Sequence, residues 1–560
     1  MLAKMFSTQR QALLYGIGCI FFLSLILPIL IIFFNGISLS SAIEETIGAR
    51  YFYGLRYLYG NETPWIPQGH FVGLSHYVIQ LILTASGHPP TELSPRIDLF
   101  TLAAIILPHF TSAVCFVWAV RPLQTTSARL LVAALALAIG YSSTLAVGIE
   151  LNQHVVQMIW WVILPDYLAW ALPFAFVTMG AILRIISKRR WQVLTLKGSI
   201  WLGVFVGTAL TTKITFLVFP FAVVSVLLFF APKWKTLYFL LTVTFPSAAF
   251  VILIILLAFY KGNVGIIIPH FNELLSFIQA ESDRTAWDPN LLYSLDYWTL
   301  VLTPKNTSDI LYLPLITIAA ILLVGLIKRS DRFLLALVPA CVLSIIVALN
   351  RFYFVSWTEV LFFCIPVLVT WGARVFQFPR HTISSVAFAP LPVLLSVVRT
   401  ALSIILIWLV FPGTLAKFEV VYQFSKAIDI GSQELNSRLK HMGGKTAFLI
   451  PINNNYHPRT INSAICKGGT QWSNPQWGDS KYMKDLFPDE ACFVMPEAPG
   501  NVDMTPFDNA VIVHRTLGKE TREETLKWTE DYFHMSLKPF GCTQKITFPD
   551  SDAIICTRLK

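Results

Sequence analysis

Residues 13–34 read LLYGIGCIFFLSLILPILIIFF, a run without a charged residue, and this stretch decides the class of the protein. A helix needs about 20 mostly apolar residues to cross the hydrocarbon core of a bilayer with its backbone hydrogen bonds satisfied internally. The run is longer than the roughly 7 to 15 apolar residues of a signal peptide, and no small-residue cleavage pattern follows it before Glu44. Leu13 to Phe34 is therefore predicted to be a membrane anchor.

The rest of the chain continues this pattern. Hydrophobic residues make up 55% of the 560 residues, charged residues only 13%, and the mean hydropathy is +0.62. Soluble globular proteins do not have this composition. Further apolar runs lie at residues 99–120, 130–147, 167–183, 201–210, 214–230, 237–259, 310–327, 333–349, 354–371 and 397–411. Together the runs predict an all-α polytopic membrane domain of about eleven transmembrane helices.

Basic residues mark every second connection between the predicted spans. They are Arg121 and Arg129; Arg184, Lys188, Arg189, Arg190 and Lys197; Lys233 and Lys235; Lys328, Arg329 and Arg332; and Arg374 and Arg380. By the positive-inside bias these connections are cytoplasmic, and Lys4 and Arg10 assign the N-terminus to the same side. After an odd number of spans, the segment that follows Pro412 is then expected on the outer face.

The formal net charge of +10 follows from this topology. No basic stripe is interleaved with base-stacking aromatic residues, so nucleic acid is not expected as a partner. The expected location is a bacterial inner membrane, with membrane lipids as partners. The apolar stretch 383–398 is an alternative twelfth span that would return the C-terminus to the cytoplasm. Arg399 argues against it, because a charge costs less at the cytoplasmic boundary of a short last helix than between two fused apolar segments.

The chain is predicted to divide into a transmembrane domain, residues 1–415, and an exported C-terminal domain, residues 416–560. In the second part, helical patterns at 420–442 and 520–533 alternate with strand-like runs at 446–451, 510–514 and 553–557. These predict a small α/β domain of about 140 residues. It has no catalytic motif. The stretch 452–489, rich in Asn, Gly, Pro and Trp, is interpreted as surface loops, with contact to a sugar or acceptor as the alternative.

Four cysteines lie in the predicted exported domain: Cys466, Cys492, Cys542 and Cys556. In an oxidising compartment they predict two disulfides. Three connectivities are possible, and the pairing of sequence neighbours closes the shortest loops. A metal site is the less favoured alternative, because no CxxC or closely spaced Cys/His pattern is present.

The first outer loop, residues 35–98, is too long for a simple turn and is rich in aromatic and polar residues. The adjacent carboxylates Glu44 and Glu45 begin it, and the run RYFYGLRYLYG follows at residues 50–60. This run predicts an amphipathic helix whose Tyr and Phe rings lie at the level of the lipid headgroups.

Several segments of the chain can be compared, in their order and predicted side of the membrane, with those of a known class of membrane proteins. They are the acidic pair after the first span; the run 49–60 that leads to Thr63 and Pro64; the segments 70–83 and 87–96; the segment 203–215 with GTALTTK at 207–213; and NRFYF at 350–354. In order and sidedness they resemble the GT-C class of glycosyltransferases, which includes lipid A aminoarabinose transferases and protein O-mannosyltransferases. The chain has Glu44-Glu45 where many relatives have Asp-Glu, and it lacks the Trp-Trp-Asp-Tyr-Gly motif of oligosaccharyltransferases.

This resemblance implies transfer of a sugar from a polyprenyl-phosphate donor to a glycan, lipid or protein acceptor on the outer face, by direct and inverting displacement. Attack by a hydroxyl needs a carboxylate that accepts its proton, and this role is assigned to Glu44 or Glu45. A solvated pair that caps the following helix is the alternative. Asp166 corresponds to a second acidic group that faces the same cavity, with a headgroup-level cap as the alternative.

Lys213, Arg351 and Arg50 are predicted to bind the donor phosphate. Lys213 lies between two tightly joined predicted spans, where an ammonium group needs an anionic partner. Guanidinium groups bind phosphate with bidentate geometry. Snorkelling of these side chains to lipid headgroups is the alternative.

The histidines of the outer loops, His70, His76 and His154, are interpreted as hydrogen-bonding residues and not as metal ligands. No metal site and no nucleotide cofactor are predicted, and a divalent cation is the one cofactor left open. Other function classes also remain: a transporter or flippase for lipid-linked sugar, a polysaccharide polymerase, and a membrane sensor with an exported ligand-binding tail. The chain has no repeated halves of the kind that many transporters show.

Overall fold

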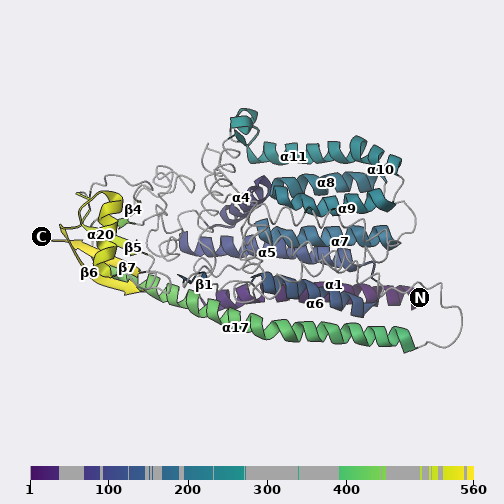
Figure 1. Cartoon of the computed structure of the whole chain (residues 1–560), viewed down its shortest axis with the longest axis horizontal. Helices are drawn as coiled ribbons and strands as arrows, with labels where there is room; N and C mark the ends of the chain where they lie inside the picture. Colours follow the sequence, from purple (N-terminus) through teal and green to yellow (C-terminus); the bar gives the residue numbers. More distant parts are fainter. Residues whose placement is uncertain are drawn as a thin grey trace, which may run out of the picture.

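A computed structural model describes residues 2–36, 69–88, 93–123, 125–144, 150–151, 154–155, 167–187, 195–230, 233–269, 271–272, 339, 343, 390–442, 444, 446–449, 492–494, 504–505, 507–514, 521–547 and 552–559. In these residues the chain forms a bundle of helices and a small C-terminal sheet, joined by one long helix (Figure 1).

The bundle consists of helices that mostly lie side by side (Figure 1). They are α1 (Leu2–Phe34), α4 (His70–Ala85), α5 (Leu93–Val120), α6 (Thr126–Thr144), α7 (Ala171–Ser187), α8 (Leu196–Thr212), α9 (Val218–Phe230), α10 (Lys233–Phe239) and α11 (Phe245–Phe259). Two short 3-10 helices, η1 (Tyr167–Trp170) and η2 (Ile214–Leu217), precede α7 and α9, and a π-helical turn, η3 (Leu240–Thr244), joins α10 to α11. The strands β1 (Glu150–Leu151) and β2 (His154–Val155) form a short antiparallel pair.

Every apolar run predicted up to residue 259 is helical over the part that the structure describes. The predicted spans 310–327, 333–349 and 354–371 lie outside the described residues, apart from Pro339 and Leu343. Asp98–Val120 and Trp234–Phe259, of 23 and 26 residues, are long and apolar enough to cross a membrane. At about 1.5 Å per residue they exceed the hydrocarbon thickness of about 30 Å. The full set of about eleven spans stays a prediction.

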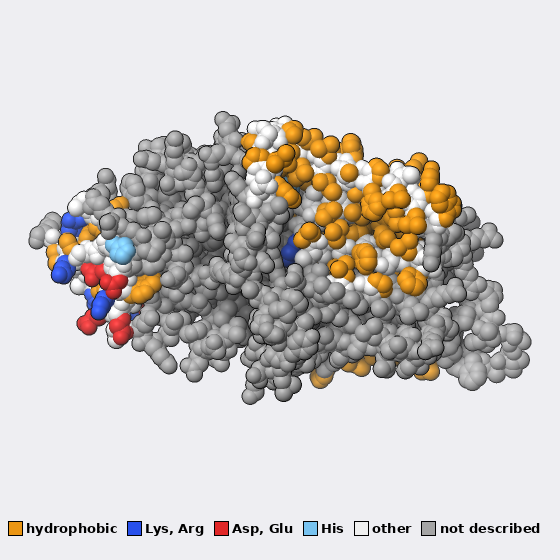
Figure 2. Space-filling model, turned by 45° about the horizontal axis from the view of Figure 1, so that its top comes forward, with side chains coloured by type: hydrophobic (Ala, Val, Ile, Leu, Met, Phe, Trp, Pro, Cys, Tyr) orange, Lys and Arg blue, Asp and Glu red, His pale blue; other side chains and the backbone are white. Residues whose placement is uncertain are grey.

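The outer surface of the bundle is apolar. Large hydrophobic side chains such as Trp201, Trp234, Leu241 and Phe250 are mostly exposed. Figure 2 shows hydrophobic side chains covering the described face of the bundle, whereas charged side chains gather on the C-terminal domain. An apolar face of this extent is unfavourable in water and suits contact with lipid.

The interior is held by aromatic stacking and close helix packing. Phe21 of α1 stacks on Phe116 of α5 with ring centroids 4.6 Å apart, and Phe176 of α7 packs edge-on against both rings. Helix α8 approaches α11 through Gly203 and Gly207, four residues apart on one face: a Cβ atom on Gly203 would lie 2.5 Å from the carbonyl oxygen of Thr244. Small residues at this spacing let two helix backbones pack closely in a membrane protein.

The two ends of the bundle differ in charge. The start of α1, the α5–α6 connection, the end of α7, and the starts of α8, α10 and α17 (Pro390–Met442) lie at one end (Figure 1). The described basic side chains there are Arg121, Arg129, Arg184, Lys197, Lys235 and Arg399. We call this the basic end. The connections predicted to be cytoplasmic therefore share one end of the bundle, as far as the structure describes them.

Helix α17 carries the chain from the basic end to the C-terminal domain (Figure 1). Near its start, the side chain of Arg399 is buried. It donates a hydrogen bond to the hydroxyl of Thr125, 3.0 Å away, in the α5–α6 connection. At its end, Leu435 is buried and Arg438 bonds to Gln544 of the sheet, 3.2 Å away. The helix runs without a break through the predicted domain boundary at residue 415, and the predicted helix 420–442 is its last part.

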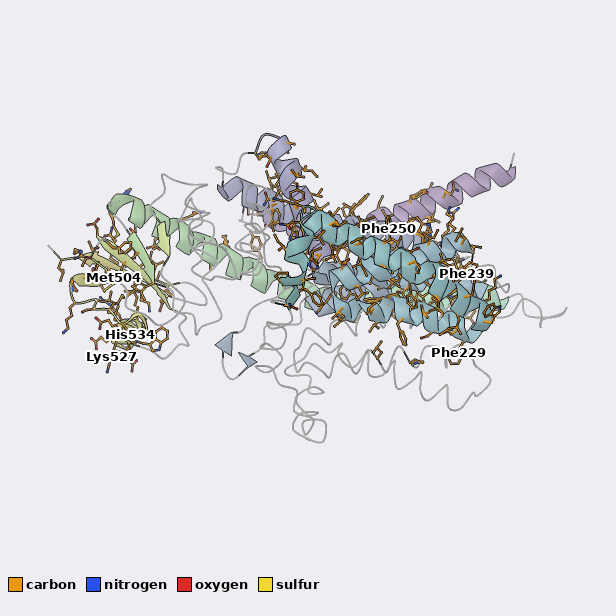
Figure 3. All side chains as sticks on the ribbon, turned by 90° about the horizontal axis from the view of Figure 1, so that it is seen from above. Phe229, Phe239, Phe250, Met504, Lys527 and His534 are labelled. Atoms are coloured by element: carbon orange, nitrogen blue, oxygen red, sulfur yellow. A yellow bond between two sulfur atoms is a disulfide. The ribbon has the colours of Figure 1, made fainter. Side chains whose placement is uncertain are left out.

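The C-terminal sheet has the strand order β4-β3-β5-β7-β6. Its strands are β3 (Thr446–Leu449), β4 (Cys492–Val494), β5 (Asn509–His514), β6 (Phe540–Thr547) and β7 (Asp552–Arg558). The neighbours of β3 are parallel to it, and β7 is antiparallel to both β5 and β6. Helix α20 (Arg522–Phe533) packs on the sheet; Met504, Lys527 and His534, labelled in Figure 3, lie in this domain, apart from the bundle residues Phe229, Phe239 and Phe250.

The small α/β domain contains the predicted strands near 446–451, 510–514 and 553–557 and the predicted helix near 520–533. It also contains β4 and β6, which the sequence pattern did not predict. A disulfide joins Cys542 of β6 to Cys556 of β7, which face each other in the ladder, so one of the neighbour pairings is present. Cys466 lies outside the described residues, and the second disulfide stays a prediction.

Candidate functional site

Most of the predicted site residues lie outside the described part of the chain. These are the candidate bases Glu44 and Glu45, the second acid Asp166, and the candidate phosphate ligands Arg50 and Arg351. Their roles stay predictions. The described member of the set is Lys213.

Lys213 is the single residue that separates α8 from η2. Its backbone is extended, its N–H donates to the carbonyl of Ala209 at 3.0 Å, and its own carbonyl accepts from the N–H of Phe216 at 2.9 Å. These bonds end one helix and start the next without a loop. The predicted tight join is therefore present, at the end of the bundle opposite the basic end (Figure 1).

Gly69 brings the start of α4 against the residues before Lys213. Its φ of +102° belongs to a region that L side chains rarely adopt. A Cβ atom on Gly69 would lie 2.1 Å from the carbonyl oxygen of Thr212 and 2.6 Å from that of Thr211. Only glycine permits this approach, so α4 and the end of α8 touch through backbone atoms.

The next residue, His70, joins α4 to α11. Its Nε2 atom lies 3.0 Å from the hydroxyl of Tyr260, at hydrogen-bonding distance, and its ring packs edge-on against Phe259 with centroids 4.8 Å apart. Tyr260 is 3% exposed and follows the last residue of α11. The interpretation of His70 as a hydrogen-bonding residue is confirmed, although the residue begins a helix and does not lie in a loop.

Gly69, His70, Lys213 and Tyr260 thus bring α4, α8 and α11 together, and we call this group the three-helix corner. The elements that meet there lie at the end of the bundle nearer the C-terminal domain (Figure 1). The ammonium group of Lys213 can bind an anionic headgroup and donate hydrogen bonds to its oxygens.

Two arginines of the basic end, Arg184 and Arg129, form hydrogen bonds to backbone carbonyls within the bundle. Arg184 donates to the carbonyls of Gly180 at 2.8 Å and Trp118 at 2.7 Å, and its guanidinium lies 3.7 Å from the Trp118 ring centroid. Arg129 donates to the carbonyl of Leu123 at 2.8 Å. Carbonyls near a helix C-terminus lack helical donors and attract cations. Arg184 therefore stabilises the end of α5, and Arg129 stabilises the connection between α5 and α6.

Sequence reasoning did not identify Gly69 or Tyr260. Their signals in the sequence are small: Gln68-Gly69-His70 is a polar break before an apolar run, and Tyr260-Lys261-Gly262 is a polar break after one. The other histidines add little. His76 is buried with its ring near that of Phe100, and only the backbone of His154 is described. Within the described ranges no group of three or more His, Cys, Asp or Glu residues is arranged to hold a metal ion.

No protein-family model and no curated protein matches the chain. Among solved structures, the crystal structure of the Archaeoglobus fulgidus oligosaccharyltransferase in complex with zinc and sulfate resembles it with a TM-score of 0.41 and 11% sequence identity, over 90% of this chain and 68% of that chain. At this TM-score the likeness shows no shared fold, and neither the fold nor the activity of that enzyme is carried over to this chain.

Proposed function

We propose that the protein is a membrane glycosyltransferase that moves a sugar from a polyprenyl-phosphate donor to a glycan, lipid or protein acceptor at the outer face of a bacterial inner membrane. One observation carries the proposal: Lys213 lies at the three-helix corner, opposite the basic end and on the side to which α17 leads the C-terminal domain. An ammonium group at this place can form charge-assisted hydrogen bonds with an anion. The phosphate of a lipid-linked donor is such an anion.

In the proposed reaction the acceptor oxygen forms a bond to the anomeric carbon while the bond from that carbon to the phosphate oxygen breaks. The phosphate keeps the electron pair, and the acceptor proton passes to Glu44 or Glu45. Lys213, with Arg50 and Arg351, stabilises the negative charge that grows on the phosphate, which lowers the barrier most where water is excluded. Asp166 orients the acceptor. The donor bond supplies the energy, so no nucleotide is required.

The three-helix corner explains how Lys213 is positioned in this scheme. The extended backbone at Lys213 and the glycine contact at Gly69 fix the end of α8. The hydrogen bond between His70 and Tyr260 fixes α4 against α11. A cation that is already fixed in place stabilises the charge that develops in the transition state, because it does not have to reorganise first. His70 is a positioning residue here.

The test is transfer of radiolabelled sugar from a panel of polyprenyl-phosphate sugars to membrane extract, with the full chain in lipid nanodiscs. The variants are Lys213→Ala, Glu44→Gln and Glu45→Gln. Lys261→Ala, which removes an exposed ammonium just after α11, is the matched control. Loss of a hydrogen bond to a charged group costs about 1.5–3 kcal/mol, so Lys213→Ala is expected to lower kcat/KM by about 10- to 150-fold. Lys261→Ala is expected to transfer like wild type.

Three results would contradict the proposal: no transfer by wild type from any donor, normal transfer by Lys213→Ala, or normal transfer by both carboxylate variants. Loss in only one carboxylate variant would name the base. A Lys213→Arg variant separates charge from shape, because it keeps the cation but changes its geometry. It is expected to retain part of the activity that Lys213→Ala loses.

A further inference from the structure

A second polar site lies at one edge of the C-terminal sheet. Asp552 is the first residue of β7 and stands directly opposite His514, the last residue of β5, and Thr547, the last residue of β6. The parallel strands β3 and β5 therefore end at the edge where Asp552 lies. After β3 the chain continues to β4, which lies on one side of the β3–β5 pair in the sheet. After β5 it continues to β6 and β7, which lie on the other side of that pair. In open α/β sheets, ligands bind beyond the carboxyl ends of parallel strands at such a switch in direction.

This edge faces the helical bundle. Strand β7 runs toward the C-terminus, which Figure 1 marks at the far end of the molecule. The first residue of β7 therefore lies at the opposite end of the strand, on the side of the bundle and of the three-helix corner. A ligand held at this edge lies between the sheet and the end of the bundle that holds Lys213.

Asp552 itself is 4% exposed, which is unusual for a carboxylate. One of its oxygens, Oδ2, forms an ion pair with the ammonium of Lys545 at 2.5 Å. The other oxygen, Oδ1, is buried, and no residue in the described part of the chain donates a hydrogen bond to it. A buried acceptor without a donor destabilises a fold, so its retention calls for a partner.

We propose that Asp552 Oδ1 accepts hydrogen bonds from the hydroxyl groups of a neutral saccharide bound at the carboxyl edge of β3 and β5. The charge of Asp552 is already neutralised by Lys545, which favours a neutral ligand with hydroxyl donors. A divalent cation would need several oxygen ligands and would be repelled by the ammonium of Lys545. The identification of this saccharide as the acceptor for transfer rests on the proposed function, whereas the binding does not.

Binding is measured with the full chain in lipid nanodiscs, first on an array of neutral oligosaccharides and then by titration of the best glycan, with and without EDTA. Asp552→Asn keeps the shape of the side chain but removes its charge. The matched control is Asp531→Asn, an exposed carboxylate on α20. Non-reducing electrophoresis checks that the Cys542–Cys556 disulfide still forms in each variant, which reports the fold of the β6–β7 hairpin.

Wild type is expected to bind a neutral glycan, Asp552→Asn to bind it at least about tenfold more weakly, and Asp531→Asn and EDTA to change nothing. The inference is overturned if wild type binds no neutral glycan, if Asp552→Asn with its disulfide intact binds like wild type, or if EDTA abolishes binding. Lys213→Ala is expected to bind the glycan normally. If wild type bound a neutral glycan but transferred no sugar, the result would support the saccharide site at Asp552 and contradict the proposed function.

Discussion

At the scale of single residues, Gly69 decides how closely α4 approaches Lys213. Gly69→Ala is expected to abolish most of the transfer activity, because the new Cβ would lie 2.1 Å from the carbonyl oxygen of Thr212 and must push α4 away from α8. Gly87→Ala is the control: its φ of +85° is also positive, but nothing lies within 4 Å of the new Cβ. Both variants carry the backbone strain of a positive φ, which costs about 1–3 kcal/mol.

Sugar transfer per folded protein, with the folded fraction taken from size-exclusion chromatography in detergent, measures this prediction. Equal loss of transfer in Gly69→Ala and Gly87→Ala would mean that backbone strain alone lowers activity. The contact between α4 and α8 would then have no special role.

The residues of the three-helix corner also mark how far sequence reasoning reaches. Lys213 was predictable, because a single basic residue between two apolar runs is a local pattern. The hydrogen bond between His70 and Tyr260 joins residues 190 positions apart. The sequence around one of them does not indicate the other as its partner. Local composition therefore indicates a residue such as Lys213, whereas a contact such as that of His70 with Tyr260 depends on long-range packing.

At the scale of elements, the contact between α8 and α11 depends on glycine. Gly203→Ala is expected to lower the stability of the protein by about 1–3 kcal/mol, the usual cost of overpacking. Its Cβ would lie 2.5 Å from the carbonyl of Thr244 and 2.6 Å from the Cβ of Ser247. Gly16→Ala in α1 is the matched control, because nothing lies within 4 Å of its new Cβ and alanine favours a helix by up to about 1 kcal/mol.

Thermal unfolding of detergent-solubilised protein is the measurement. A lower midpoint for Gly203→Ala, with no decrease for Gly16→Ala, is expected. If both variants melt like wild type, the two helices can separate slightly at no cost, and the close packing is not a source of stability.

The start of α20 gives a pH-dependent prediction. The backbone N–H and the hydroxyl of Thr521 donate to Glu524 Oε2 at 2.7 and 2.9 Å and hold the pKa of Glu524 below its ordinary value of 4.5. A lowered carboxyl pKa stabilises the folded state above the ordinary value, and this stabilisation is lost as the pH falls through the folded-state pKa. The amides of α20 are therefore expected to be better protected from hydrogen exchange in wild type than in Glu524→Gln near neutral pH.

This difference between wild type and Glu524→Gln should shrink below pH 4.5 and vanish in stronger acid. Comparison of the two proteins at each pH removes the intrinsic pH dependence of exchange. A difference that stayed constant down to strong acid would exclude the carboxylate as its cause.

Elements with a strong local pattern were the ones that the sequence predicted. Apolar runs gave the helices of the bundle, and β-branched runs gave β5 and β7. Strand β6 reads FGCTQKIT, which alternates weakly between polar and apolar residues and begins beside a glycine, so it was missed. Pro412 and Gly413 predict a break by their low helix propensity, yet α17 continues through them. The structure gives no physical account of that continuation.

At the scale of the whole molecule, the directions of the helices constrain the predicted topology. Helix α11 ends at the end of the bundle opposite the basic end, and α17 starts at the basic end, tied there by the bond from Arg399 to Thr125 (Figure 1). Two opposite ends of a bundle can be connected through membrane spans only by an odd number of them. The three spans predicted at 310–327, 333–349 and 354–371 satisfy this condition, and a further complete span at 383–398 does not.

The prediction at this scale is that the C-terminal domain and the α5–α6 connection lie on opposite sides of the membrane. Alkaline phosphatase, which becomes active only where disulfides form, is expected to be active when fused after Lys560 and inactive when fused after Gln124; green fluorescent protein should report the reverse. The Cys542–Cys556 disulfide gives a second readout without a fusion, because it forms only in an oxidising compartment. Inactive phosphatase after Lys560 together with reduced Cys542 would put the sheet in the cytoplasm. An acceptor site at Asp552 would then be on the wrong side of the membrane for the proposed reaction.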